Sequence, residues 1–546
     1  MAAALAEPSP AAHRKVVCIG FMGAGKSTAA RSAAEALGAA YVDVDTAIEE
    51  RLGKPIERVF AEDGEAAFRA VEERTTLELL DAPGPGVLAL GGGAIGHERV
   101  RQALSAHLVV WLDVGLEVAW TRCRDSGRPL ARERSQFESL YRRREPIYAG
   151  LADVVVPAER SHKMEPILAA HANVPQKTKL LWAATAGKPS ADYPVYVGNG
   201  LLGDHRFWPD GVTGRRFLVT DGAVGRLYAD LVQPLSGRVA IMPGEQSKTV
   251  AHAEIVWTEL ARGGMTRQDV VVALGGGVVG DLAGFCAATY QRGVRYVQVP
   301  TTLVAQVDSA YGGKTGVDLA EAKNYVGAFH QPSAVITDAA MLDTLPPAEL
   351  AAGYAEVLKT ALIAGGDLWE RVRRDADADA DAGADANAHA GAGSGAGSGA
   401  DRPTDPGLIA ACALTKLRIV ARDERDAGLR QVLNLGHTVG HAIETVTGYA
   451  SYRHGEAVAL GLLAALRLSG QTELRDEVEH LLTARHLPTR LEHADPDAVV
   501  MATARDKKRV GEGAVPFVLL DAPGSPRTGC EVPPKALIAA VRELSG

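Results

Sequence analysis

A short apolar run, a glycine-rich loop and a helix-forming run follow one another near the start of the chain. Val16 to Ile19 lead into Gly20-Phe-Met-Gly-Ala-Gly-Lys-Ser-Thr28, and the run AARSAAEAL then closes at Gly38. A strand, a loop and a helix in this order are the context that a phosphate-binding loop needs, because the loop amides and the helix N-terminus can cradle phosphates. The arrangement therefore predicts an α/β domain with a nucleotide site.

The loop also supplies the side chains that phosphate chemistry uses. Lys26 would reach the β and γ phosphates of a nucleotide, and Ser27 would hold Mg²⁺. The predicted contacts to ATP and its phosphates from this loop are Gly23, Gly25, Lys26, Ser27 and Thr28.

Two aspartates accompany the next apolar run, Tyr41-Val-Asp43-Val-Asp45. Alternation along a strand would place both carboxylates on the same side of its end, where ligands gather in open α/β sheets. There they could hold magnesium and bind or deprotonate a substrate hydroxyl. An alternative is that Asp45 only caps the helix TAIEERL, which would leave Asp43 unexplained.

Further motifs follow in the same part of the chain: Phe68-Arg69 with Glu72, Leu90 before three glycines, Arg128-Pro-Leu, and Arg144 before Pro146. With the loop and the aspartates, these motifs make residues 14 to 157 resemble the shikimate kinases. The resemblance implies that Lys26 and Ser27 contact ATP and magnesium, that Asp43 belongs to the magnesium shell and that Asp45 is the catalytic base. It implies a shikimate site formed by Asp45, Arg69, Gly91, Gly92, Gly93 and Arg144. Arg128 would lie in a mobile lid and meet the phosphate during transfer.

Two interruptions divide the chain. Residues 172–192 have scattered apolar residues and proline, as an interdomain linker would. Residues 375–405 alternate Asp with Ala and then become Gly/Ala/Ser repeats, so we expect a disordered insertion without large apolar side chains to bury. The predicted organisation is a disordered tail (1–13), a P-loop kinase domain (14–171), a linker (172–192), an NAD-binding α/β domain (193–343) and an α-helical metal and substrate domain (344–546) that contains the insertion.

A second glycine-rich turn follows the apolar run Asp-Val-Val-Val-Ala-Leu, as Gly275-Gly-Gly-Val-Val-Gly280-Asp281. The spelling Gly-x-Gly-x-x-Gly also occurs from Gly91 to Gly96, so spelling alone does not identify a dinucleotide site. The acid expected about 20 residues further on in a simple Rossmann fingerprint is also missing. A turn that accommodates phosphate is the minimum that this segment predicts.

A histidine-rich stretch lies after the insertion, as Asn434-Leu-Gly-His437-Thr-Val-Gly-His441, with His454-Gly-Glu456 shortly after. On a helix His437 and His441 share a face, and such imidazoles can bind a divalent metal or move protons. The alternative is that they are satisfied histidines packed in a helical core. Upstream, Glu356 and Lys359 are three residues apart, which places them on one helical face.

Many charged residues accompany these motifs between Asp221 and Lys508, and their order resembles the 3-dehydroquinate synthases over about 190–546. The resemblance implies three zinc ligands, with open positions for substrate hydroxyls: Glu356, His437 and His454. It makes His441, Lys314 and Asp426 catalytic residues. It assigns NAD⁺ to Asp221, Glu245, Lys248, Gly275, Gly276, Gly277, Asp281, Thr301, Thr302 and Lys323. It assigns the sugar-acid phosphate substrate to Arg292, Asp308, Lys314, Asn324, Lys359, Lys416, Arg430, Asn434 and Lys508.

The chain departs from the synthase pattern at a few positions. Asp426 stands where a glutamate is usual in a proposed proton relay, which shortens that side chain by one methylene. Ala310-Tyr311 replaces a usual Ser-Val, and Ala322 replaces a usual glycine.

Composition limits the other possibilities. The formal charge of −9, from 58 basic and 67 acidic side chains, argues against a long basic face for nucleic acid. Five cysteines without paired spacing fit a reducing cytoplasm. We expect no export and no membrane span, because neither a signal-like start nor a run of about 18 apolar residues occurs.

The expected protein is therefore an α/β fusion of a P-loop kinase domain with a parallel sheet, a Rossmann-like domain and an all-α zinc domain. The resemblances imply two activities: cyclisation of 3-deoxy-D-arabino-heptulosonate 7-phosphate to 3-dehydroquinate and phosphate, and phosphorylation of shikimate by ATP. The expected cofactors are NAD, zinc or cobalt, and magnesium. We also expect a homodimer formed through the synthase half. Alternatives are another sugar-phosphate cyclase or a polyol dehydrogenase fused to a small-molecule kinase, or a fusion with one dead, regulatory half.

Overall fold

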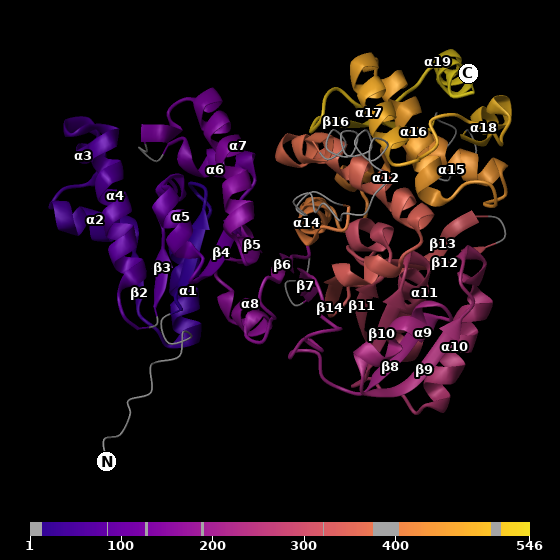
Figure 1. Ribbon diagram of the computed structural model, residues 1–546, viewed down its shortest axis with the longest axis horizontal. Coiled ribbons are helices and arrows are strands. Elements are labelled where there is room, and N and C mark those ends of the chain that lie inside the picture. The colour runs from indigo at the N-terminus through magenta and orange to yellow at the C-terminus, as the bar shows by residue number, and fades with distance from the viewer. Residues whose placement is uncertain are drawn as a thin grey trace, which may run out of the picture. The chain divides into compact units, whose positions relative to one another are not determined.

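The computed structural model describes residues 14–84, 86–125, 129–186, 191–319, 322–374, 403–503 and 515–545. Two compact units divide the chain: the first holds residues 1–184 and 209–211, and the second holds residues 185–208 and 212–546. Each is described separately below (Figure 1). Among the described residues, no helix combines the length and the apolar character that crossing a membrane would require.

The first unit alternates strands and helices around a parallel sheet with the strand order β2-β3-β1-β4-β5-β6. All five residues of the central strand β1 are buried, as expected for a sheet covered on both faces. The strands are β1 (Val16–Gly20), β2 (Tyr41–Asp43), β3 (Val87–Ala89), β4 (Leu108–Asp113), β5 (Val154–Pro157) and β6 (Lys179–Ala183). The helices are α1 (Lys26–Leu37), α2 (Val44–Leu52), α3 (Ile56–Glu62), α4 (Gly64–Asp81), α5 (Glu98–Leu104), α6 (Leu116–Cys123), α7 (Arg134–Leu151) and α8 (Met164–His171).

The prediction that residues 172–192 form only a linker is wrong for part of that segment. Strand β6 lies inside it and pairs in parallel with β5, Val154 opposite Leu180. Leu180 and Leu181 are buried, because the strand extends the covered sheet of the first unit. The unit boundary therefore follows this strand, between residues 184 and 185.

The second unit begins with another parallel sheet, ordered β7-β14-β11-β10-β8-β9. Every residue of β10 is buried, and helix α11 follows it after the glycine-rich turn. The strands of this sheet are β7 (Tyr193–Gly198), β8 (Arg216–Asp221), β9 (Leu235–Ile241), β10 (Val270–Gly275), β11 (Arg295–Pro300) and β14 (Ala334–Asp338). Its helices are α9 (Val224–Tyr228), α10 (Val250–Arg262) and α11 (Gly277–Thr289), and an antiparallel pair β12 (Lys314–Leu319) and β13 (Ala322–Phe329) packs against α11.

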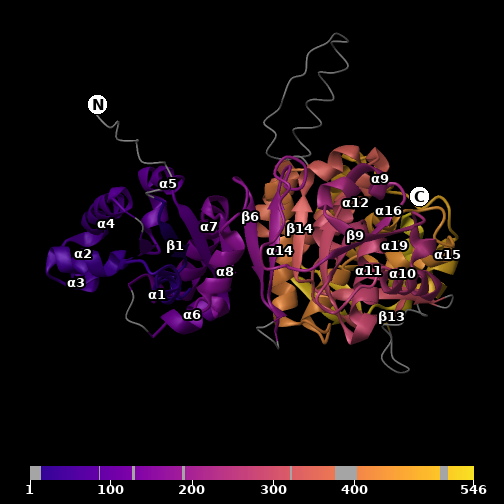
Figure 2. The same cartoon turned by 90° about the horizontal axis from the view of Figure 1, so that it is seen from below.

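Helices form the rest of the second unit, and Figure 1 shows most of them at the end of the unit opposite β8 and β9. In the view from below, α12 and α16 therefore overlap β9 (Figure 2). Their bounds are α12 (Pro347–Ala364), α14 (Pro406–Arg422), α15 (His437–Val446), α16 (His454–Leu468), α17 (Thr472–Ala484), α18 (Pro496–Thr503) and α19 (Pro534–Glu543). The predicted α/β architecture is confirmed, but the helical region also contains a two-stranded antiparallel ladder, β15 (Phe517–Leu520) with β16 (Pro526–Cys530), that an all-α domain would lack.

The predicted insertion ends earlier than expected. Asp405 accepts a hydrogen bond from the amide of Leu408 and pairs with Arg371, so it caps α14 and belongs to the folded unit. Residues 375–402 of the predicted insertion, and the predicted tail 1–13, lie outside the described residues.

Candidate functional site

The phosphate-binding loop of the first unit joins β1 to α1. Gly23 and Gly25 have left-handed backbones, with φ of 76° and 85°, and Gly25 is the N-cap of α1. Ser27 and Thr28 lie in the first turn of this helix, where amides point outward. The ammonium of Lys26 lies back over the loop, 3.3 Å from the carbonyl oxygen of Phe21.

The two aspartates occupy different elements, so the prediction that both project from one strand is wrong. Asp43 ends β2 and caps α2 by accepting a hydrogen bond from the amide of Asp45, at 3.1 Å. The cap is therefore Asp43 and not Asp45, which lies in the first turn of α2. Asp43 also accepts a hydrogen bond from the Ser27 hydroxyl, at 2.6 Å, and this pair is suited to share a magnesium ion.

A cavity of about 800 Å³ brings the loop and both aspartates together with three arginines, Arg69, Arg122 and Arg144. Its lining includes Gly23, Gly25, Lys26, Ser27, Thr28, Asp43, Asp45, Arg69, Glu72, Gly92, Gly93 and Arg144. Gly91 stands directly behind this wall, because a Cβ there would lie 2.6 Å from carboxylate oxygens of both Asp45 and Glu72. Arg128 lies outside the described residues.

Glu72 organises the arginine side of this cavity. It is buried on α4, and its carboxylate lies 2.5 Å from Nη1 of Arg69 and 3.6 Å from Nε2 of His97. Arg144 comes from α7, and burial lowers the pKa of its guanidinium. An anion bound in the cavity would therefore stabilise the charged form of Arg144. The sequence analysis assigned Arg69 to the shikimate site but gave no role to Glu72, although the two residues are three apart on one helix.

The glycine-rich turn of the second unit packs closely against its neighbours. Gly275 ends β10, Gly276 caps α11, and Gly277 begins the helix. A Cβ on Gly276 would lie 3.0 Å from the methyl group of Thr302, and one on Gly277 would lie 3.0 Å from the hydroxyl of Ser309. The amide of Thr301 donates to the carbonyl oxygen of Gly275, at 3.0 Å, so these predicted NAD residues do meet at one strand end.

Asp221 lies at the end of the neighbouring strand β8. Its carboxylate accepts hydrogen bonds from the amides of Ala223 and Val224, at 2.8 and 2.9 Å. Asp221 lies at the same edge of the sheet as the glycine-rich turn, because β8 and β10 are adjacent and parallel.

A row of charged side chains runs from α11 to the β12–β13 pair. Lys248 lies 2.6 Å from Asp281 and 3.9 Å from Glu245, and Glu245 lies 3.3 Å from Lys323. Burial opposes the charge on Lys248, but Asp281 and Glu245 outweigh it and raise the pKa of the ammonium. Four predicted NAD residues thus form one connected group.

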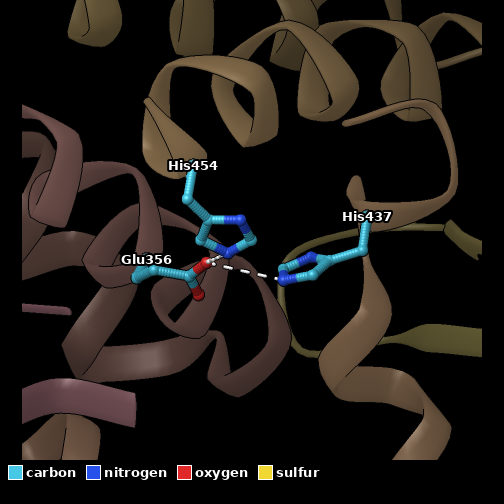
Figure 3. A group of neighbouring side chains, drawn as sticks. All are labelled: Glu356, His437 and His454. Atoms are coloured by element: carbon cyan, nitrogen blue, oxygen red, sulfur yellow. Dashed lines mark ion pairs between the residues drawn. The ribbon is translucent and has the colours of Figure 1, made fainter. Parts of the chain in front are cut away.

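The three predicted zinc ligands meet in the helical region. Glu356 on α12, His437 on α15 and His454 on α16 direct their polar atoms toward one point (Figure 3). Oε1 of Glu356 lies 3.5 Å from Nε2 of His437 and 3.2 Å from Nε2 of His454. Both Glu356 oxygens are buried, yet neither takes a hydrogen bond of standard geometry from the described residues. A carboxylate and two imidazoles in this arrangement fit zinc and leave coordination positions open.

Glycines allow the helices that carry these ligands to approach one another. A Cβ on Gly455 would overlap the backbone of Ala352 on α12, and one on Gly461 would overlap the carbonyl oxygen of Gly436 just before α15. The close crossing of α12, α15 and α16 therefore places Glu356, His437 and His454 together, although they are far apart in sequence.

His441 and Glu444 lie beside the cluster on α15. The ring of His441 is centred 5.2 Å from that of His437, as expected for one helical turn. Glu444 is buried, and its Oε1 lies 3.4 Å from Nδ1 of His454 and 3.3 Å from Nζ of Lys323. Burial would raise the pKa of Glu444, but His454, Lys323 and His441 lower it to about 2. Glu444 is a polar residue of the site that the sequence analysis missed, although its spacing of seven from His437 predicts the same helix face.

A buried ionic group adjoins Glu356. Lys359 lies 2.5 Å from Glu356 and 2.8 Å from Asp308, and Lys416 pairs with the other oxygen of Asp308. Burial alone would raise the pKa of Asp308, but Lys359 and Lys416 hold it well below its usual range. Burial, with Arg430 and Lys359 nearby, lowers the pKa of Lys416 to about 8 despite Asp308. An anionic ligand would relieve this crowding of cations.

The remaining predicted substrate residues are only partly brought together. Lys314 lies 2.5 Å from Asp426, and buried Arg430 donates to the carbonyl oxygens of Gly312 and Glu424. Asn434 ends the short helical turn before His437. Two residues stand apart from the cluster. Arg292 is exposed and, among the described residues, shows no hydrogen bond or ion pair to it. Asn324 is also exposed, and its backbone amide donates a hydrogen bond to the carboxylate of Asp318. Lys508 lies outside the described residues.

Comparisons with known proteins match both units. Family models for shikimate kinase, for the 3-dehydroquinate synthase N-terminal domain and for its C-terminal domain match residues 22–173, 238–352 and 353–509. The 3-dehydroquinate synthase of Halorhodospira halophila is 43% identical over 362 residues, which cover 63% of this chain and 94% of that protein. The enzyme from Symbiobacterium thermophilum is 41% identical over 366 residues, covering 63% and 96%.

A solved structure extends the likeness of the second unit. The 2-epi-5-epi-valiolone synthase of Streptomyces hygroscopicus, solved with NAD⁺ and Zn²⁺ bound, superimposes with a TM-score of 0.55 at 25% identity and covers 64% of this chain and 96% of that one.

Proposed function

Because the chain belongs to the 3-dehydroquinate synthase family and carries a shikimate kinase domain before it, we propose that it is a bifunctional shikimate-pathway enzyme. The second unit converts 3-deoxy-D-arabino-heptulosonate 7-phosphate to 3-dehydroquinate and phosphate. The first transfers the γ-phosphate of ATP to shikimate. The observation that carries the synthase assignment is the meeting of Glu356, His437 and His454 with the Lys359–Asp308–Lys416 group at one buried place.

In the synthase, the three metal donors hold zinc, or cobalt in its place, and the residues of the β10–α11 turn hold NAD⁺. Bound there, the metal would supply a Lewis acid for the substrate hydroxyl, and NAD⁺ would supply reversible hydride chemistry. A ring nitrogen of His441 receives the hydroxyl proton. The ketone acidifies the adjacent C–H, whose proton passes to a phosphate oxygen of the substrate. The electron pair of that C–H forms a C=C bond, and the phosphate leaves with the electron pair of its C–O bond, while Lys314, Lys359, Lys416 and Arg430 balance the substrate anions.

In the kinase, positioning and charge neutralisation supply most of the rate. Asp45 accepts the proton of the shikimate hydroxyl that attacks the γ-phosphate. Lys26 neutralises the phosphate oxygens, while Ser27 and Asp43 hold magnesium. Arg69 and Arg144 bind the shikimate carboxylate, and the cavity shared by all of these residues supports the assignment.

Two assays on the purified full chain test the proposal. With zinc and catalytic NAD⁺, we expect phosphate release from 3-deoxy-D-arabino-heptulosonate 7-phosphate without net NADH, and with Mg-ATP we expect shikimate-dependent ADP. NADH that accumulates with a polyol would identify a dehydrogenase. Absence of either turnover would identify a dead half. Asp45→Asn should abolish ADP formation, and an unchanged rate would reject Asp45 as the base.

The proposal extends to assembly and location. The second unit forms a homodimer, supported by Tyr325 and Phe329, which are 63% and 46% exposed and four residues apart on β13. Light scattering should give twice the chain mass, and a monomer at every concentration would reject the homodimer.

A cytoplasmic location is supported by the five cysteines, all described, which form no disulfide. Fractionation of cells with an antibody against the chain tests the location.

A further inference from the structure

Glu444 is a buried carboxylate for which the reaction described above gives no role. Its side chain is 4% exposed on α15, seven residues after His437. Burial of a charged carboxylate destabilises the fold unless cations or hydrogen-bond donors compensate it. Its partners therefore indicate why an acid is present at this position.

The first partner is a metal-ligand histidine. His454 directs Nε2 toward Glu356, at 3.2 Å, and Nδ1 toward Glu444, at 3.4 Å. An imidazole that binds a cation through Nε2 carries its proton on Nδ1, and an ionised carboxylate can only accept that proton's hydrogen bond. His437 uses a backbone acceptor instead, because its Nδ1 lies 3.1 Å from the carbonyl oxygen of Leu435. Of the two histidine ligands, His454 is therefore the one that, among the described residues, has a charged side chain at its Nδ1.

The second partner belongs to the nucleotide side of the unit. Nζ of Lys323 lies 3.3 Å from Oε1 of Glu444 and 3.3 Å from Oε1 of Glu245. Glu245 also pairs with Lys248, and Lys248 pairs with Asp281 on α11. A sequence of alternating charges therefore connects a metal ligand to the helix that follows the glycine-rich turn.

We propose that Glu444 is a positioning residue that couples metal binding to dinucleotide binding. It holds His454 in the metal-binding tautomer and simultaneously holds Lys323 against the nucleotide-side residues. The inference rests on the proposed synthase function. Zinc bound by Glu356, His437 and His454 fixes the ring of His454, which keeps Glu444 in the position where it contacts Lys323. Conversely, NAD⁺ in contact with Lys323 keeps Glu444 in the position where it contacts His454. Linkage requires the two effects to be equal.

Binding measurements on the full chain test this coupling without turnover. Zinc affinity is measured by competition with a chromophoric chelator, with and without saturating NAD⁺, and NAD⁺ affinity is measured by calorimetry with and without zinc. We expect each to strengthen the other about fivefold or more, with one zinc bound per chain.

Two substitutions separate the roles of Glu444. In Glu444→Ala, zinc affinity should fall about 10- to 100-fold, as for loss of an outer partner of a metal ligand. Glu444→Gln keeps an oxygen for the Nδ1 proton, so zinc affinity should stay within about threefold. It loses the charge that attracts Lys323, so the coupling should disappear. Glu479→Gln, which removes an acid paired with Arg475 on α17, is the matched control and should keep both.

Each other outcome is decisive. Coupling that persists in Glu444→Gln, or unchanged zinc affinity in Glu444→Ala, overturns the proposal. Two zinc ions per chain would make Glu444 a ligand with His441 and His454 and would also overturn it. A wild-type chain that binds neither zinc nor NAD⁺ would instead reject the synthase function itself. Circular dichroism spectra that match the wild type show that the variants are folded.

Discussion

The two candidate sites are constructed in different ways. The phosphate-binding loop of the first unit takes its main residues from one short segment, Gly20 to Thr28, between a strand and the helix that it starts. The metal cluster of the second unit takes Glu356, His437 and His454 from three helices. Local backbone geometry alone shapes the phosphate-binding loop, whereas the metal cluster exists only if α12, α15 and α16 pack closely. A local motif is therefore robust to changes elsewhere, and a site assembled by packing is not.

Removing one key residue from each site should give the largest effects and test the independence of the two units. Lys26→Ala should lower the kinase rate by about 1,000-fold or more, because the transferring phosphate loses its cation. His437→Ala should abolish zinc binding and phosphate release together. Each variant should keep the other activity within about twofold, as measured by ADP and phosphate assays. A loss of both activities from one substitution would show that the units depend on each other.

Gly461→Ala should reveal the dependence of the metal cluster on packing. The new methyl group overlaps the backbone oxygen of Gly436, which cannot rotate away, so α15 and α16 must separate. We expect the free energy of unfolding of the second unit to fall by about 3 kcal/mol and zinc content to fall with it, measured by denaturation and metal analysis. Gly203→Ala is the control, because its Cβ meets no atom within 4 Å. Full zinc content in Gly461→Ala would contradict the packing argument.

The same contrast explains what could be predicted from the sequence. Gly25, Lys26 and Ser27 were assigned from spacing because loop and helix geometry follow local sequence. Sequence also placed His437 and His441 on one face, since both lie on one helix. It could not show that Glu444 reaches His454 and Lys323, because that contact depends on how α15, α16 and β13 pack.

Errors in the sequence analysis arose where two local structures compete. Tyr41 to Asp45 alternates like a strand, yet the strand ends at Asp43 because this residue caps α2 and draws Asp45 into the helix. Residues 179–183 carry too little pattern for a strand on their own. They form a strand because the edge of β5 presents backbone N–H and C=O groups with which they can pair.

Gly93→Ala should affect the first unit in a milder way. The added methyl overlaps the guanidinium of Arg69, which is the far end of a flexible side chain and can move. The fold should therefore persist, while Arg69 leaves its place beside Glu72. We expect the KM for shikimate to rise about tenfold, as for one weakened charged hydrogen bond, with the KM for ATP unchanged. Gly96→Ala, whose Cβ meets nothing within 4 Å, should leave both values as they were.

Asp426→Glu should have the smallest effect, and it tests how much exact side-chain reach matters in the assembled site. Lys314 beside Asp426 is 49% exposed, so solvent screens the pair and its contribution is about 1 kcal/mol or less. Lys314 can follow a carboxylate that is one methylene longer, so we expect the rate of phosphate release to change by less than about threefold. Asp426→Asn removes the charge while keeping the size, and it should slow release more than Asp426→Glu does. If Asp426→Glu instead raised the rate tenfold or more, the short side chain of Asp426 would be limiting proton transfer in the natural chain. The activity of the assembled site would then depend on the exact reach of an outer side chain as well as on the metal ligands.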